Sequence, residues 1–182
     1  MAERENEWFS LFKMVIFVSV FVLAVRIFLL TPVVVDGASM LPTFEDGDRV
    51  VVNKQAKIHR FDIIVFAVDD QTNYIKRVIG LPGDHIAYKK DILYINGQPY
   101  EEPYLQQFKE NIPLDTLLTE NFTLEKYTGY TTIPEGYLFV LGDNRKKSTD
   151  SRDPILGLVS VDSVLGEVKA IFYPFQNSKF VN

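Results

Sequence analysis

The sequence contains no cysteine and only two histidines, His59 and His85, among its 182 residues. Without cysteine the chain can form neither a disulfide framework nor a thiolate metal site. The histidines lie 26 positions apart, a spacing that fits no zinc motif. The chain also lacks an excess of positive charge, because it has 19 Lys and Arg but 24 Asp and Glu, which gives a net charge of -5. We therefore expect neither a zinc site nor a nucleic-acid partner.

One long apolar run lies near the N-terminus. Residues 11–30 are interrupted only by one serine and two charged residues, Lys13 and Arg26, and about twenty apolar residues are enough to cross the core of a bilayer. The two charges lie toward opposite ends, where their long side chains can reach the two headgroup layers. A cleavable signal peptide is the alternative, but the run exceeds the usual length of about 7 to 15 residues, and Pro32 follows instead of small residues. We therefore predict a retained transmembrane anchor.

Beyond the anchor, short apolar runs alternate with turn residues. Segments rich in Val, Ile, Tyr and Phe favour β-strands, which we expect at 48–54, 62–68, 74–80, 91–97, 136–143 and 168–175. Tight turns are expected at Asn96-Gly97, Pro82-Gly83 and Pro134-Glu135-Gly136. The predicted fold is therefore mainly β and antiparallel. The predicted organisation is a short cytoplasmic N-terminus at 1–10, the anchor at 11–31 and a β domain at 32–182, with an insertion or subdomain at 101–132.

A single serine, Ser39, ends the segment "VVVDGAS". Alternation along an extended chain places Val33, Val35, Gly37 and Ser39 on one face, so the serine would end an apolar groove. A groove of this kind beside an unpaired strand edge could bind an extended peptide by strand addition. The alternative is that Ser39 only forms a turn and has no catalytic role, because a hydroxyl is a nucleophile only when a base activates it.

The candidate base is Lys76, which interrupts an apolar strand. The alternative is a charge on a solvated strand edge. If the side chain is instead buried, its pKa falls from roughly 10.4 by as much as a few units, and a neutral amine becomes available. A polar loop at 142–159 follows another apolar strand. In that loop Ser148 could hydrogen-bond an amine, and Asp150 and Arg152 could form an ion pair.

Four stretches resemble, in order and spacing, the sequence boxes of type I signal peptidases. They are "SMLPT" at 39–43, "GDRVVVNK" at 47–54, "KRVIGLPGD" at 76–84 and "GDNRKKSTDSR" at 142–152. The resemblance covers nearly the whole chain except 101–132, and the single anchor and compact size are similar to the Gram-positive, Bacillus-type members. It implies an antiparallel, barrel-like catalytic β domain outside the cell membrane, with the N-terminus in the cytoplasm.

The same resemblance implies roles for individual residues. Ser39 would be the nucleophile, Lys76 the general base and Ser148 the hydroxyl that holds the lysine amine. Archaeal and endoplasmic-reticulum relatives carry histidine at the base position, so a lysine indicates a serine-lysine dyad without a metal or cofactor. The implied substrates are preproteins at the lipid bilayer, cut after small residues in sites of the A-x-A type. We expect the side chains before the cut to contact Val33, Val35, Met40, Tyr74 and Ile75.

Two positions depart from the family pattern. Gly37 stands where many Gram-negative relatives have a serine that assists the oxyanion, so we expect the backbone N–H groups of Ser39 and Gly37 to form the oxyanion hole. Lys146 stands where many relatives have an aspartate, and we expect altered surface electrostatics there without loss of activity. The remaining charged residues of the last box keep the pattern and are expected to be structural: Asp143, Arg145, Asp150 and Arg152.

Two other functions fit parts of the sequence. A membrane-tethered β domain could bind peptides without cutting them, and a self-cleaving serine-lysine repressor relative would use the same two residue types. No DNA-binding domain is present, which disfavours the second. The apolar "MLPTF" at 40–44 also predicts that the edge of the active site dips toward the bilayer.

Overall fold

The computed structural model describes residues 2–28, 30–113 and 116–181. The helices are α1 (Ala2–Phe28), α2 (Gln106–Asn111) and α3 (Leu124–Thr128). The strands are β1 (Leu30–Val34), β2 (Arg49–Asn53), β3 (Ile63–Ala67), β4 (Asn73–Gly80), β5 (Ile86–Lys89), β6 (Ile92–Ile95), β7 (Gln98–Tyr100), β8 (Phe122–Thr123), β9 (Tyr137–Leu141), β10 (Val159–Ser160), β11 (Val164–Tyr173) and β12 (Lys179–Phe180). The 3-10 helices are η1 (Pro103–Leu105), η2 (Val161–Ser163) and η3 (Phe175–Asn177).

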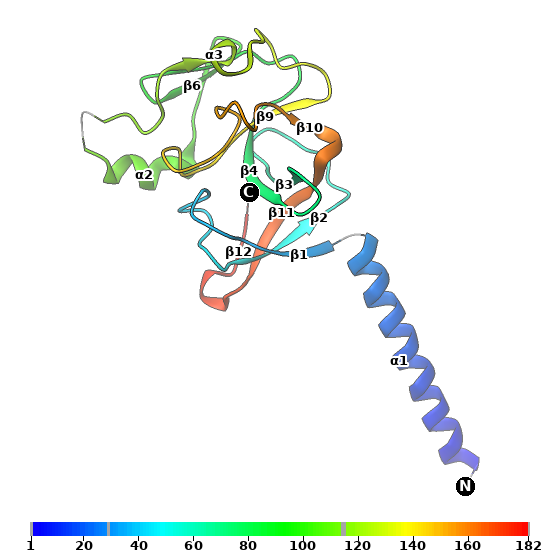
Figure 1. The fold of residues 1–182 in the computed structure, drawn as a ribbon. Coiled ribbons are helices and arrows are strands. Elements are labelled where there is room, and N and C mark those ends of the chain that lie inside the picture. Colours follow the sequence, from blue (N-terminus) through cyan, green and yellow to red (C-terminus); the bar gives the residue numbers. More distant parts are fainter. Residues whose placement is uncertain (1, 29, 114–115, 182) are drawn as a thin grey trace.

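Helix α1 projects away from the β part of the molecule as a single rod (Figure 1). Its side chains are described for 8–23, and all of these are exposed. Within the described residues, no helix is both long enough and apolar enough to cross a membrane. The predicted anchor at 11–31 extends past them, because residue 29 and the side chains of 24–28 and 30 lie outside the described residues.

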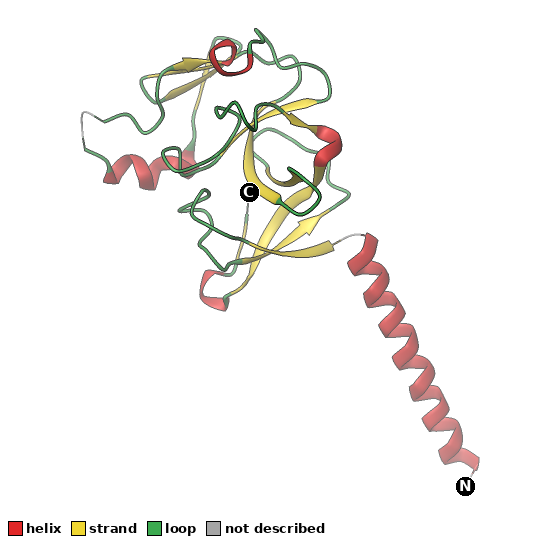
Figure 2. Ribbon diagram, in the orientation of Figure 1, coloured by secondary structure: helices red, strands yellow, loops and turns green. Residues whose placement is uncertain are grey.

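The larger sheet is antiparallel and runs in the order β1-β2-β11-β3-β4-β9-β10, with β12 on β11. Strand β3, "IIVFA", is apolar throughout because it is covered on both faces. Its residues Ile63 and Val65 belong to a core that also contains Val52 and Val168, whereas the alternate residues pack into a second core with β9 and β10. The sheet curls around the first core, as the yellow strands in Figure 2 show.

A smaller antiparallel sheet, β7-β6-β5-β8, packs over a third core. Its third strand, β5, begins shortly after β4 ends, and β8 lies within the segment 101–132. That segment also contains η1, α2 and α3. The small sheet therefore joins this segment to the chain that leads out of β4 (Figure 1).

The mainly β, antiparallel prediction is confirmed. Each of the six predicted strands is present, as β2, β3, β4, β6, β9 and β11, although β11 begins at Val164, four residues before the predicted start. The turn predictions also hold, since Asn96, Gly97, Gly83 and Gly136 all have positive φ values. The strands that periodicity missed are mostly short, and strands such as β8, β10 and β12 hold two residues each. Runs of that length carry no alternation, so only pairing with longer neighbours defines them.

Candidate active site

Ser39 lies in the turn that follows β1 and leads into β2. The turn is held by backbone hydrogen bonds from Leu41 to Ala38, 3.3 Å, and from Phe44 to Met40, 3.0 Å. The side chains of Met40 and Phe44 are 1% and 0% exposed, so they anchor the turn in the core. Of the apolar residues in "MLPTF", Met40 and Phe44 are therefore turned inward and Leu41 is partly exposed, and the dipping of this edge toward the bilayer stays a prediction.

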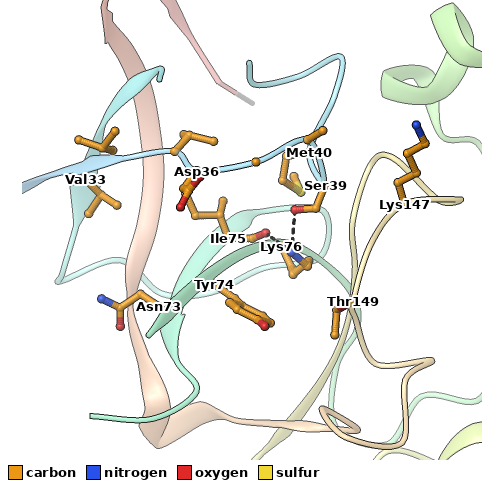
Figure 3. A pocket seen from close by; sticks show the side chains of 14 residues that line it. Val33, Asp36, Ser39, Met40, Asn73, Tyr74, Ile75, Lys76, Lys147 and Thr149 are labelled. Carbon is orange, nitrogen blue, oxygen red and sulfur yellow. Dashed lines mark hydrogen bonds between the residues drawn. The ribbon is translucent and has the colours of Figure 1, made fainter. Parts of the chain in front are cut away.

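Lys76 lies in the middle of β4 and is 3% exposed, which excludes the alternative of a solvated edge charge. Its Nζ lies 2.9 Å from Ser39 Oγ and 3.0 Å from the carbonyl oxygen of Ile75 (Figure 3). The strand thus aims the amine at the serine hydroxyl, and the carbonyl fixes the direction of the amine.

Burial controls the charge of this lysine. Removal from water lowers the pKa of Lys76 from 10.5 to about 8, and the carboxylates of Asp150 and Asp143 oppose that shift. Both carboxylates are already engaged by arginines, Asp150 by Arg152 and Asp143 by Arg77. In the described part of the chain Lys76 itself forms no ion pair. A buried amine with this pKa is neutral often enough near neutral pH to accept a proton.

Asp143, at the end of β9, ties together the three segments that carry the site. Arg77 donates to both of its carboxylate oxygens, at 2.9 and 2.7 Å, and the Thr43 hydroxyl donates to one of them at 2.5 Å. The arginine and the aspartate are both fully buried. The base strand, the serine turn and the loop after β9 are therefore held in one fixed arrangement.

Asn144 makes a second tie, which the sequence analysis did not single out. Its backbone N–H donates to the carbonyl oxygen of Ser39 and its side-chain amide donates to that of Ala38, both at 3.0 Å. An asparagine next to a structural aspartate in a polar loop is the only sequence signal for this role, because the partners are more than a hundred residues away.

A groove of about 430 Å³ runs past the serine. One wall is the chain from Val33 to Met40, and the other is Asn73 to Lys76 of β4, with Lys147 and Thr149 beyond them (Figure 3). All five side chains expected to contact substrate line it: Val33, Val35, Met40, Tyr74 and Ile75.

Comparison with known proteins agrees with this arrangement. The family model described as "Signal peptidase, peptidase S26" matches residues 8–173. The chain belongs to this signal peptidase family. It is 49% identical over 169 residues to "Signal peptidase I" of Bacillus caldolyticus, covering 90% of this chain and 91% of the relative. It is 41% identical over 176 residues to "Signal peptidase I S" of Bacillus subtilis, covering 93% and 91%.

A crystal structure of a signal peptidase I from Enterococcus faecalis is also similar. It shares 45% sequence identity with a TM-score of 0.58, over 62% of this chain and 97% of that chain. As a member of the signal peptidase family, the protein is a serine peptidase, a hydrolase of peptide bonds.

The hydrogen bond expected between Ser148 and the Lys76 amine is not formed. Among the described residues the Ser148 hydroxyl is buried without a hydrogen-bond partner. The Ser148 side chain instead packs against Gly142, where a Cβ added to the glycine would overlap Ser148 Oγ and lie 2.6 Å from the Ser39 carbonyl oxygen.

The backbone of Gly37 is also not available as an oxyanion donor. Its N–H donates to the Asp46 carboxylate at 2.7 Å. Within the described ranges the N–H of Ser39 has no acceptor. This leaves Ser39 as the remaining donor of the two that were expected.

The charged residues of the last signal peptidase box form ion pairs. Arg152 contacts Asp150 at 2.7 Å, and Arg145 contacts Glu102 at 2.6 Å. Arg145 is fully buried and also donates to the hydroxyls of Tyr88 and Thr119. Glu102 was missed from the sequence because it lies in the weakly patterned 101–132 segment. Where residues are described, His, Asp and Glu form no cluster of three that could hold a metal ion.

Proposed function

We propose that the protein is a membrane-anchored serine endopeptidase that removes N-terminal signal peptides from secreted preproteins after small residues. Ser39 is the nucleophile and neutral Lys76 is its general base. The observation that carries the proposal is the 2.9 Å contact between Lys76 Nζ and Ser39 Oγ, made by an amine whose pKa burial lowers to about 8.

The groove receives the peptide as an added strand. Strand β1 pairs with β2 alone, and the stretch Asn73–Lys76 of β4 pairs with β3 alone, so each has an edge with no strand partner in the described part of the chain. The two edges face the same groove. Backbone hydrogen bonds to these edges hold the peptide extended, and the apolar lining of Val33, Val35 and Ile75 leaves shallow space for small side chains.

Both halves of the reaction use one amine to move protons. Lys76 takes the proton of Ser39 as Oγ attacks the scissile carbonyl, and the protonated amine then gives a proton to the leaving nitrogen as the C–N bond breaks. Lys76 then takes a proton from water as the water oxygen attacks the resulting ester, and it returns that proton to Ser39 Oγ as the ester C–O bond breaks. The N–H of Ser39 donates to the oxyanion during both steps.

Helix α1 is the single-pass anchor in the cell membrane, with the N-terminus in the cytoplasm and the β domain outside. The twenty residues 11–30 with two charges support this assignment. In membranes from expressing cells the protein should resist alkaline carbonate extraction, and protease added outside intact protoplasts should remove the β domain. Recovery of the full chain in the carbonate supernatant would contradict the anchor.

The test of the activity is cleavage of a model preprotein by the full chain in detergent, with the new amino terminus sequenced. Ser39→Ala should lower the rate by a factor on the order of 10⁶. Ser178→Ala, which changes an exposed serine outside the groove, is the matched control and should cleave at the wild-type rate. If the preprotein binds but no shortened product forms with wild-type protein, the chain is a peptide-binding domain and the proposal is wrong.

A further inference from the structure

The two ends of the groove have different walls. On one side of Ser39 the lining is mainly apolar, from Val33, Val35 and Ile75, with Asp36 at its rim. On the other side the wall is the loop after β9, which contributes Lys147 and Thr149 (Figure 3). Both of these loop side chains are exposed.

The difference gives the bound peptide a direction, on the basis of the function proposed above. Small side chains before the cut occupy the apolar end, so the chain after the cut must leave past the loop. An extended peptide advances about 3.3 Å per residue. The first residues of the mature protein therefore pass the wall of the groove that Lys147 lines.

Lys147 carries a positive charge that forms no ion pair among the described residues. The acidic residues that precede and follow it in the loop are already paired, Asp143 with Arg77 and Asp150 with Arg152. In the part of the chain that the structure describes, Lys147 has no ion pair. Its amine is free to meet a charge on the substrate.

The preceding residue provides an internal comparison. Lys146 is also exposed, but it lines a second hollow of about 700 Å³, together with Ser148 and Arg152. It does not line the groove that contains Ser39. Two neighbouring lysines with the same charge thus face different surfaces.

We propose that Lys147 is a specificity-determining residue that favours preproteins with an acidic side chain at one of the first two mature positions and disfavours those with a basic one. An exposed ion pair stabilises by about 0.2 to 1 kcal/mol, which corresponds to about 1.4-fold to 5-fold in kcat/KM. Because the acidic substrate is attracted and the basic one repelled, the ratio between their kcat/KM values is about 2-fold to 25-fold at low salt.

The experiment uses the full chain and three preproteins that differ only in carrying Glu, Gln or Lys at the first two mature positions. Wild-type enzyme should cut them in the order Glu, Gln, Lys, and the differences should shrink at 1 M salt, where the Debye length is about 3 Å. Lys147→Glu should reverse the order. Lys146→Glu is the matched control and should keep the wild-type order.

Each outcome has a separate meaning. If Lys147→Glu cuts the three preproteins in the wild-type order, Lys147 does not contact the mature segment and the inference is wrong. If Lys146→Glu reverses the order as well, the effect belongs to the general surface potential, and the assignment to Lys147 is also wrong. In both cases cleavage itself continues, so the proposed function stands. Loss of cleavage for every preprotein with wild-type enzyme would instead overturn the proposed function.

Discussion

Replacing Lys76 by arginine should abolish cleavage, although the positive charge and most of the side-chain length remain. Arginine cannot release its proton near neutral pH, because its pKa exceeds roughly 12. A lysine with a pKa of about 8 has about one amine in ten neutral at pH 7, whereas one with a pKa of 10.5 has about one in 3000. Burial therefore increases the amount of active base about 300-fold at this pH.

The pH profile of the wild-type enzyme measures the same effect. Since kcat/KM reports the pKa of the free enzyme, it should rise about tenfold between pH 6 and pH 7 and level off above a midpoint near 8. The assay is cleavage of a model preprotein by the full chain in detergent at constant ionic strength. Lys146→Arg, at an exposed position outside the groove, is the control and should retain wild-type activity.

Lys76→Met separates loss of the base from loss of the fold. The difference between a pKa of 8 and one of 10.5 corresponds to about 3 kcal/mol, the cost of keeping the amine charged in the folded state. Below pH 8 the amine is charged in both states and the full cost applies, so Lys76→Met should be more stable than wild type at pH 6. As the pH rises from 8 to 10.5 only the folded state loses the proton, and the advantage should shrink. An active Lys76→Arg variant, or a wild-type midpoint above pH 10, would refute the assignment of the base.

Two other changes test the frame around the dyad. Arg77→Met leaves the fully buried Asp143 carboxylate without its arginine partner. The free energy of unfolding measured in denaturant should therefore fall by about 3 to 5 kcal/mol. A loss below about 1 kcal/mol would mean that the ion pair does not hold the segments together. Gly142→Ala adds a methyl group that overlaps the Ser148 side chain and lies 2.6 Å from the Ser39 carbonyl oxygen. It should therefore lower kcat by more than tenfold while the protein stays folded by circular dichroism, and wild-type kcat would show that the loop can shift without moving the nucleophile.

The longer strands were predictable because their signal is local. Strands β3 and β9 are apolar runs of five residues, and β4 is a run of eight that Lys76 and Arg77 interrupt. Such runs between turns have few alternatives to a strand. The two-residue strands β8 and β10 were not, because each exists only by pairing with β5 or β9. The missing hydrogen bond between Ser148 and Lys76 was also not predictable, because it depends on how the loop after β9 packs Ser148 against Gly142.

The sequence by itself determined the family, the order of the boxes and the residue types of the dyad, because a signal peptidase motif is a pattern of neighbours along the chain. Tertiary structure decided the rest. Ser39 and Lys76 are 37 positions apart, and their contact requires the sheet to bring β4 to the turn after β1. The lowered pKa of the amine has the same origin, because only the packed strands around Lys76 remove it from water. The loop conformation likewise places Lys147 in the groove and Lys146 in the second hollow, although the two residues are adjacent in the sequence.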